Sequence, residues 1–236
     1  MEINLWIAFV FMFSLGGFGV WYLSKSGTPS VKYAMRGKYL VYLLLSSIMF
    51  LVSMYSSFFY LICLVISLMG LYEIYTLALP KNIKLFSITF FLPLSLFFVY
   101  FTYISDPYDA SLLLLLVLGL DGFSQIFGNA FGKNAIAKNI SPNKTWEGFL
   151  GGYFCVMAGY LFIRQLDVDM VGILMIGILI ASALSGDLLA SYLKRRSGVK
   201  DFNGFIPFHG GVLDRFDSLI VASAIAAPFY MTGIKL

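Results

Sequence analysis

The sequence of 236 residues contains little charge, one histidine and only two cysteines. Charged residues make up 12% of the chain and hydrophobic residues 60%, whereas soluble domains average about 25% charged residues. The cysteines form no Cys-x-x-Cys pair, which argues against a zinc site. The net charge of +4 is modest, and the basic residues lie beside hydrophobic runs, so we expect no binding to nucleic acid.

Long hydrophobic runs fill most of the chain, and a membrane-spanning helix needs about 20 mainly apolar residues. The sequence predicts eight such helices, near 3–23, 38–55, 57–79, 84–104, 110–128, 147–164, 170–192 and 217–234. Only Ser56 and Ser57 divide the second helix from the third. We therefore expect an all-α, polytopic integral membrane protein in which residues 1–236 form a single transmembrane domain.

Most basic residues lie in the loops after the first, third, fifth and seventh predicted helices. They are Lys25, Lys32, Arg36, Lys38, Lys81, Lys84, Lys133, Lys138, Lys144, Lys194, Arg195, Arg196, Lys200 and Arg215. Cytoplasmic loops of membrane proteins carry an excess of Lys and Arg. We expect these four loops at the cytoplasmic face of the cell membrane, and both termini outside.

Three acidic residues, Glu73, Asp121 and Asp187, lie within or near the ends of predicted membrane helices. A charged side chain in the bilayer is costly unless it is paired or hydrated. Glu73 is near enough to a helix end to reach the interface, and helix–helix pairing is an equally open interpretation. Such acids also mark ion pathways, so a transporter or a non-catalytic membrane protein is one alternative. No chain of ionisable groups crosses the bilayer, however, because the acids gather at one face.

The stretch 185–217 has the composition of a site for a metal ion and a polyphosphate. Three side chains recur at helical spacing, on roughly one face: Asp187, Ser191 and either Lys194 or Arg195. Asp214 and Asp217 are three residues apart, so both carboxylates can point in one direction. Carboxylates are ligands that Mg²⁺ prefers, and lysine and arginine neutralise phosphate charge. Gly210 and Gly211 leave room for a ligand to approach the backbone.

A second polar stretch, 128–148, contains Ser141-Pro142 followed by Asn143, Lys144 and Thr145. Thr145 is placed to cap a helix whose first turn holds Glu147. A helix N-terminus with a lysine and hydroxyl groups nearby is a natural phosphate site.

Together the two stretches resemble the phosphatidate cytidylyltransferases, also called CDP-diacylglycerol synthases. The matching segments are Ser-Pro-Asn-Lys-Thr-Trp-Glu-Gly at 141–148, Ser-Tyr-Leu-Lys-Arg at 191–195, Lys-Asp at 200–201 and Pro-Phe-His-Gly-Gly-Val-Leu-Asp-Arg-Phe-Asp at 207–217. The resemblance is strong over about 120–217, the expected catalytic part, and is mainly one of hydropathy over 1–119; residues 217–236 supply the last helix. The sequence departs from the family at Ala190, where an acidic residue is common, and at Ser124-Gln125, where the family has Ala-Tyr.

The resemblance implies transfer of the cytidylyl group of CTP to phosphatidate, giving CDP-diacylglycerol and pyrophosphate. It implies these catalytic residues: Asp187, Lys194, Arg195, Asp214 and Arg215. The implied substrate-binding residues are Ser141, Asn143, Lys144, Thr145, Glu147, Ser191, His209, Gly210 and Gly211, with His209 as a hydrogen-bond donor. The implied Mg²⁺ ligands are Asp187, Asp214 and Asp217, beside a monovalent cation such as K⁺. The implied assembly is a homodimer among membrane lipids, and the alternative function is a CTP-dependent enzyme acting on another lipid phosphate.

Overall fold

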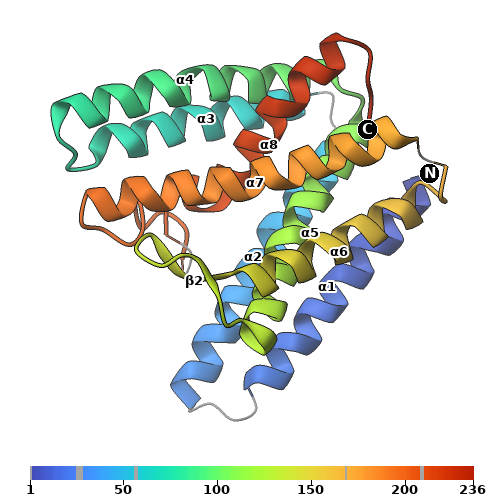
Figure 1. The fold of residues 1–236 in the computed structure, drawn as a ribbon, viewed down its shortest axis with the longest axis horizontal. Helices are drawn as coiled ribbons and strands as arrows, with labels where there is room; N and C mark the ends of the chain where they lie inside the picture. Colours follow the sequence, from blue (N-terminus) through green and yellow to red (C-terminus); the bar gives the residue numbers. More distant parts are fainter. Residues whose placement is uncertain (1, 25–28, 56–57, 168, 208–209) are drawn as a thin grey trace.

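The computed structural model describes residues 2–24, 29–55, 58–167, 169–207 and 210–236. Lys25, Ser56, Ser57 and His209, which the sequence analysis singled out, lie outside these residues. The described helices are α1 (Glu2–Ser24), α2 (Pro29–Tyr55), α3 (Phe59–Thr76), α4 (Lys81–Ile104), α5 (Pro107–Phe131), α6 (Trp146–Ile163), α7 (Met170–Arg196) and α8 (Leu213–Met231). Strands β1 (Ala135–Ala137) and β2 (Ser141–Thr145) form an antiparallel hairpin between α5 and α6 (Figure 1).

Seven helices of the described chain, α1 to α7, are long and apolar enough to cross a membrane. The expectation of an all-α, multi-pass membrane protein is therefore confirmed, although the small hairpin was not predicted. The eighth helix, α8, begins at Leu213 instead of at 217, so it also contains Asp214 and Arg215. These charges lower its apolar content, and α8 is not among the seven.

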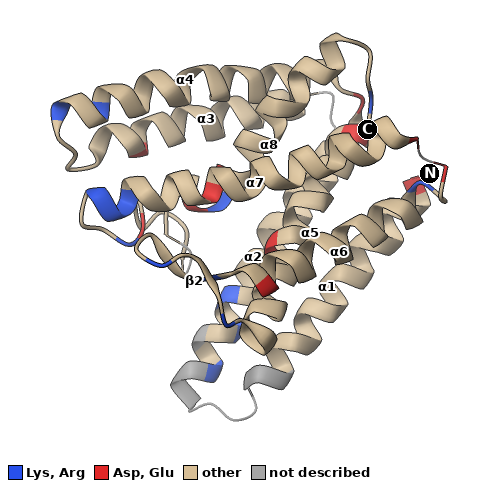
Figure 2. Ribbon diagram, viewed as in Figure 1, with Lys and Arg blue, Asp and Glu red and all other residues tan. Residues whose placement is uncertain are grey.

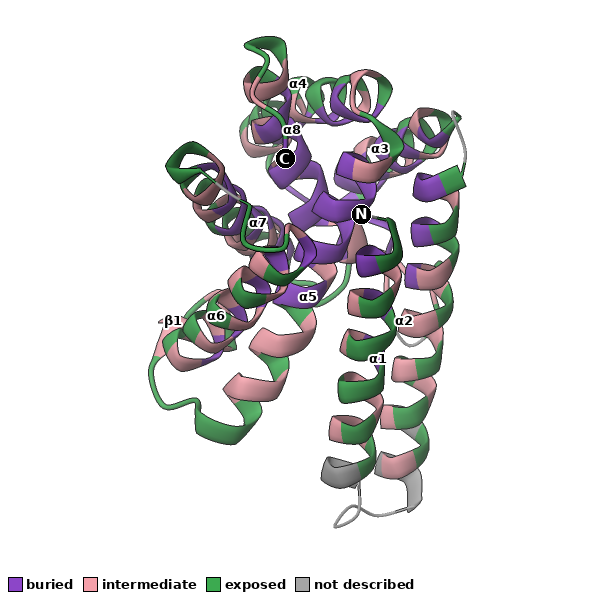
Figure 3. Ribbon diagram, turned by 90° about the vertical axis from the view of Figure 1, so that its right-hand side faces the viewer, coloured by how far each residue is buried: buried purple, intermediate pink, exposed green. Residues whose placement is uncertain are grey.

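Helix α5 lies at the centre of the bundle, in contact with α1, α2, α6, α7 and α8. Its residues 109–117 are all buried. Figure 3 shows this buried centre, and it shows exposed outer faces on α1 and α2. Large apolar side chains such as Phe11 and Leu40 are exposed there, as expected for helix faces that meet lipid instead of water.

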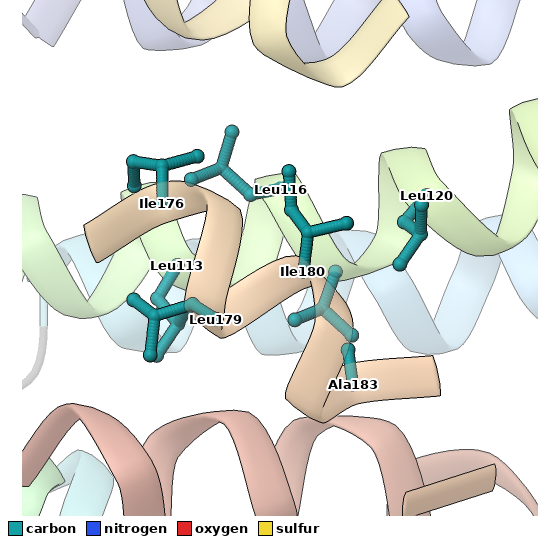
Figure 4. Close-up of a pocket in the computed structure, with 8 residues that line it drawn as sticks. Leu113, Leu116, Leu120, Ile176, Leu179, Ile180 and Ala183 are labelled. Carbon is teal, nitrogen blue, oxygen red and sulfur yellow. The ribbon is translucent and has the colours of Figure 1, made fainter. Parts of the chain in front are cut away.

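The packing between α5 and α7 is purely aliphatic. Figure 4 shows Leu113, Leu116 and Leu120 of α5 beside Ile176 and other apolar side chains of α7, around a void of about 10 Å³. A space of this size without polar partners holds no ligand. This contact serves to pack the helices, and the chemistry lies elsewhere.

Both termini lie on one side of the molecule (Figure 1). Polar side chains there join the C-terminal residues to the start of α5. The Tyr230 hydroxyl donates a hydrogen bond to the buried Asp109 carboxylate and accepts one from the Leu236 amide, at 3.1 Å. Lys235 pairs with Asp106 at 2.9 Å, and both side chains are exposed. Many lysines and arginines lie away from the termini, at the hairpin, at the start of α4 and at the end of α7 (Figure 2).

Candidate active site

Two ion pairs form at the end of α7 that is remote from the termini. The Lys144 ammonium of β2 pairs with the Asp187 carboxylate of α7. The Lys194 ammonium, also on α7, pairs with the Asp214 carboxylate in the first turn of α8, at 2.5 Å. These four residues come from β2, α7 and α8, and the fold brings them together as two ion pairs.

The Asp214 carboxylate is held by more than its lysine. One oxygen accepts the Lys194 ammonium, and the other accepts hydrogen bonds from the backbone amides of Phe202 and Gly211, both at 2.8 Å. The Asp214 side chain is only 2% exposed. These contacts supply the hydrogen-bond partners that a buried carboxylate requires. Asp214 therefore fixes the loop before α8 as well as carrying charge.

Further charges lie around Lys144. Asp121 of α5 is close enough to interact electrostatically with Lys144, Asp217 and Arg215. Asp217, one turn after Asp214 on α8, interacts with Lys144, Lys194 and Arg215. The Nε atom of Arg215 is buried without a hydrogen-bond partner in the described structure. We call the following seven residues the polar cluster: Asp121, Lys144, Asp187, Lys194, Asp214, Arg215 and Asp217.

The position of Lys144 shapes its protonation. Burial lowers the pKa of the Lys144 ammonium, whereas the carboxylates of Asp121 and Asp217 raise it by favouring the charged form. Because the ammonium also pairs directly with Asp187, acidic side chains from α5, α7 and α8 all face one cation. The carboxylates of this arrangement can bind a cation, and the ammonium can bind a phosphate group.

The hairpin residues predicted to bind substrate mainly shape the backbone. The Thr145 hydroxyl accepts a hydrogen bond from the Gly148 amide at 3.2 Å and caps α6, as the sequence predicts. The Glu147 carboxylate accepts bonds from the Lys133 and Asn134 amides, each at 3.1 Å. Ser141 pairs with Ala137 in the sheet, and the Asn143 side chain is exposed. Of this predicted set, only Lys144 enters the polar cluster.

Two further predicted residues of α7, Arg195 and Ser191, make contacts within the protein. Arg195 is exposed, and its guanidinium donates to the carbonyl oxygens of Ile140 at 3.2 Å and Val199 at 3.0 Å. It therefore ties the hairpin to the end of α7 and stays outside the polar cluster. The Ser191 hydroxyl lies one helical turn from Asp187 and donates to its carboxylate at 3.4 Å.

Gly210 and Gly211, whose backbone is predicted to approach a ligand, lie against carboxylates of the protein. A Cβ atom on Gly211 would lie 2.5 Å from a Glu73 carboxylate oxygen, and one on Gly210 would lie 2.7 Å from an Asp214 oxygen. Gly210 also has a φ of +87°, which favours glycine. The space that a side chain would fill is therefore occupied by two carboxylates of the protein itself.

The expected trio of metal ligands is also not assembled. Within the described residues, no group of three or more His, Cys, Asp and Glu side chains is arranged to hold a metal ion. Asp214 has both oxygens engaged, and Asp187 and Asp217 lie on different helices. Mg²⁺, however, commonly binds one or two carboxylates together with substrate phosphates. The carboxylates around the Lys144 ammonium fit such a cation.

An apolar cavity of about 320 Å³ adjoins the polar cluster, between α4, α7 and α8. Its walls include Phe86, Phe90 and Leu94 of α4, Leu189 and Leu193 of α7, and Val221 of α8. Asp217 is among the residues that line this cavity, so one residue of the polar cluster belongs to both regions. A charged cluster and an apolar space therefore meet at a single point, which suits a ligand with a charged head and a hydrocarbon tail.

A family model described as Cytidylyltransferase family matches residues 85–232, more than half of the chain. This chain belongs to the cytidylyltransferase family. The family inferred from the sequence motifs is thus confirmed.

Several relatives carry the name phosphatidate cytidylyltransferase. The Haemophilus influenzae protein is 40% identical over 140 residues, which cover 54% of this chain and 49% of that protein. The protein of Staphylococcus aureus strain COL is 40% identical over 110 residues, or 45% of this chain and 42% of the relative. The Mycobacterium leprae protein is 32% identical over 139 residues, or 51% and 45%. The chain thus spans about half the length of the curated relatives it matches.

The segment of this cytidylyltransferase-family chain that the family model matches, 85–232, includes all seven residues of the polar cluster. From the sequence, Asp121 and Glu73 are acids within or near the ends of predicted membrane helices, and helix–helix pairing is one interpretation of Glu73. Asp121 faces the cluster, and Glu73, outside the matched segment, contacts the start of α8. The signal in the sequence was an acidic residue in an otherwise apolar helix. That signal does not identify the residues that the acid contacts in the fold.

Proposed function

We propose that the protein transfers the cytidylyl group of CTP to phosphatidate, producing CDP-diacylglycerol and pyrophosphate. The observation that carries this proposal is the junction of the polar cluster with the apolar cavity at Asp217. The names of the relatives and the family support the same activity. A lipid phosphate needs both regions, since its head is anionic and its tails are hydrocarbon.

The cations of the polar cluster are the proposed phosphate ligands. Lys144, Lys194 and Arg215 come from three elements and surround the region where Asp187 and Asp217 lie. Arg215 has a buried Nε without a partner in the described structure, so a donor is available for a ligand oxygen. Two anionic substrates repel each other, and fixed cations that neutralise them lower the barrier to their meeting.

In the proposed reaction, an oxygen of the lipid phosphate attacks the α-phosphorus of CTP. A bond forms between that oxygen and the α-phosphorus, and the bond from the α-phosphorus to the bridging oxygen breaks as pyrophosphate leaves. A lipid phosphate is already ionised near neutral pH, so the protein needs no general base. The protein contributes position and charge instead.

Mg²⁺ is the proposed cofactor, and Asp187, Asp214 and Asp217 are the candidate residues to hold it. When bound with CTP, Mg²⁺ would neutralise part of the charge on the phosphates. Asp187 is the clearest of the three candidates, because its side chain is partly exposed and its main partner is a lysine. Lys144 pairs with Asp187, so the same ammonium lies where it could contact a phosphate bound beside that carboxylate.

The apolar cavity is the proposed place for an acyl chain of the lipid. Its walls come from α4, α7 and α8, which all lie among the membrane helices. An acyl chain that moves from the bilayer into this cavity exchanges one apolar environment for another, so the hydrophobic effect contributes little to its binding. Selection among chains should therefore depend on how well they fill the space.

The membrane orientation also belongs to this proposal. The start of α4 and the end of α7 carry lysines and arginines, and the positive-inside rule puts them in the cytoplasm, where CTP is available, and puts both termini outside (Figure 2). A monovalent cation such as K⁺ and a homodimeric assembly are further expectations from the family.

The decisive assay uses purified protein with CTP, Mg²⁺ and a panel of lipid phosphates. Phosphatidate should be converted, and Asp187→Asn should lower turnover on the order of a hundredfold. Asp106→Asn is the matched control, since Asp106 is an exposed acid on the side of the termini. Conversion of a polyprenyl phosphate but not of phosphatidate would replace the proposed acceptor. No CTP-dependent product with any lipid would support a transporter or a non-catalytic protein.

A further inference from the structure

Glu73 is the only charged residue of α3, and it is completely buried. Its two carboxylate oxygens accept hydrogen bonds from the backbone amides of Val212 and Leu213, each at 2.8 Å. A buried carboxylate is costly without such partners. The contact joins residues 139 and 140 positions apart in the chain.

These amides belong to the start of α8, where backbone N–H groups have no partner within the helix. Glu73 takes two of them, and Asp214 takes the Gly211 amide. Two carboxylates therefore satisfy three consecutive amides, and their negative charge also suits the positive end of the helix dipole. The start of α8 is thus fastened to α3 from one direction and to its own Asp214 from another.

The loop before α8 is shaped around this contact. A Cβ on Gly211 would lie within 2.8 Å of three atoms of the Glu73 carboxyl group. Any larger residue would push the carboxylate away from the amides it accepts. Gly211 and Glu73 therefore act as one unit.

We propose that Glu73 is a positioning residue for the catalytic end of α8. By holding the first turn of α8, it sets where Asp214, Arg215 and Asp217 lie relative to Lys144 and Lys194. The inference rests on the proposed cytidylyl transfer, and it assigns a role at that site to α3, outside the segment 85–232 that the family model matches.

Glu73→Gln tests this role, because a glutamine accepts only one of the two amides and turns its NH₂ group toward the other. We expect turnover per folded molecule to fall about ten- to a hundredfold. Hydrogen exchange of a peptide covering 205–216 should become faster in the same variant. Asp109→Asn is the matched control, since Asp109 is a buried carboxylate on the side of the termini. It should leave both readouts at the wild-type level.

A second variant, Gly211→Ala, displaces the same contact from the other side. Its turnover should fall like that of Glu73→Gln, and the double variant should fall little further, since both changes break one interaction. Wild-type turnover per folded molecule in Glu73→Gln, with unchanged exchange at 205–216, would overturn the positioning role. If the wild-type protein transfers no cytidylyl group, the proposed function fails, and hydrogen exchange alone decides whether Glu73 holds α8.

Discussion

The ion pair between Lys194 and Asp214 predicts a measurable separation of stability from catalysis. Its side chains are 10% and 2% exposed, so the pair is largely removed from solvent. Replacing Lys194 by methionine keeps a long apolar side chain and removes only the ammonium. The Asp214 carboxylate then keeps its bonds to two backbone amides, but it loses its counter-charge.

Breaking a buried pair by removing one partner costs about 3–5 kcal/mol. The two backbone amides still stabilise Asp214, so we expect about 3 kcal/mol for Lys194→Met, near the lower end of that range. Adding Asp214→Asn removes the stranded charge, and the asparagine oxygen can still accept from the backbone. The double variant should therefore be more stable than Lys194→Met by about 2 kcal/mol, while both lack turnover.

The assay is equilibrium unfolding in mixed micelles with increasing SDS, compared with turnover on the same preparations. Lys235→Met is the matched control, because it removes a lysine from an exposed pair and should leave the unfolding midpoint unchanged. The reasoning is refuted if Lys194→Met unfolds at the same midpoint as Lys235→Met, or if the double variant is less stable than Lys194→Met.

Three further predictions concern single contacts. Leu189→Trp should fill the apolar cavity and lower turnover of long-chain phosphatidate about tenfold more than turnover of a short-chain form. Leu174→Trp, on the exposed face of the same helix, is the control and should not lower it; equal losses for the two chain lengths in Leu189→Trp would contradict the prediction. Thr145→Val should cost about 1 kcal/mol of stability by removing the α6 cap, measured by SDS unfolding, without raising the KM for CTP; a raised KM with unchanged stability would restore the hydroxyl as a substrate ligand. Arg195→Ala should reduce kcat less than about tenfold, and Lys144→Met on the order of a hundredfold; the reverse order would return Arg195 to the site.

The helices and the family were accessible from the sequence because their signals are local. Runs of about 20 apolar residues predict helices in a membrane, and the Thr145 cap depends on residues only three apart. The start of α8 was predicted four residues late, at 217. The charges of Asp214 and Arg215 precede the last hydrophobic run and indicated a loop, but both residues lie in the first turn of α8, where Asp214 pairs with Lys194.

The partners within the site were not accessible, because they depend on contacts between distant segments. Glu73 and Val212 are 139 residues apart, and no local pattern links an acid in α3 to two glycines before α8. The family resemblance implies catalytic roles for both Lys194 and Arg195, yet adjacent helical positions point in different directions. One faces Asp214 and the other faces the hairpin.

The most direct test of the central claim follows the phosphorus atoms of CTP. Purified protein with phosphatidate and Mg²⁺ is given CTP labelled either at the α- or at the γ-phosphate. Attack on the α-phosphorus predicts that the α-label enters the lipid product and that the γ-label leaves entirely as pyrophosphate. Transfer of the γ-label to the lipid, or release of either label without phosphatidate, would contradict the account.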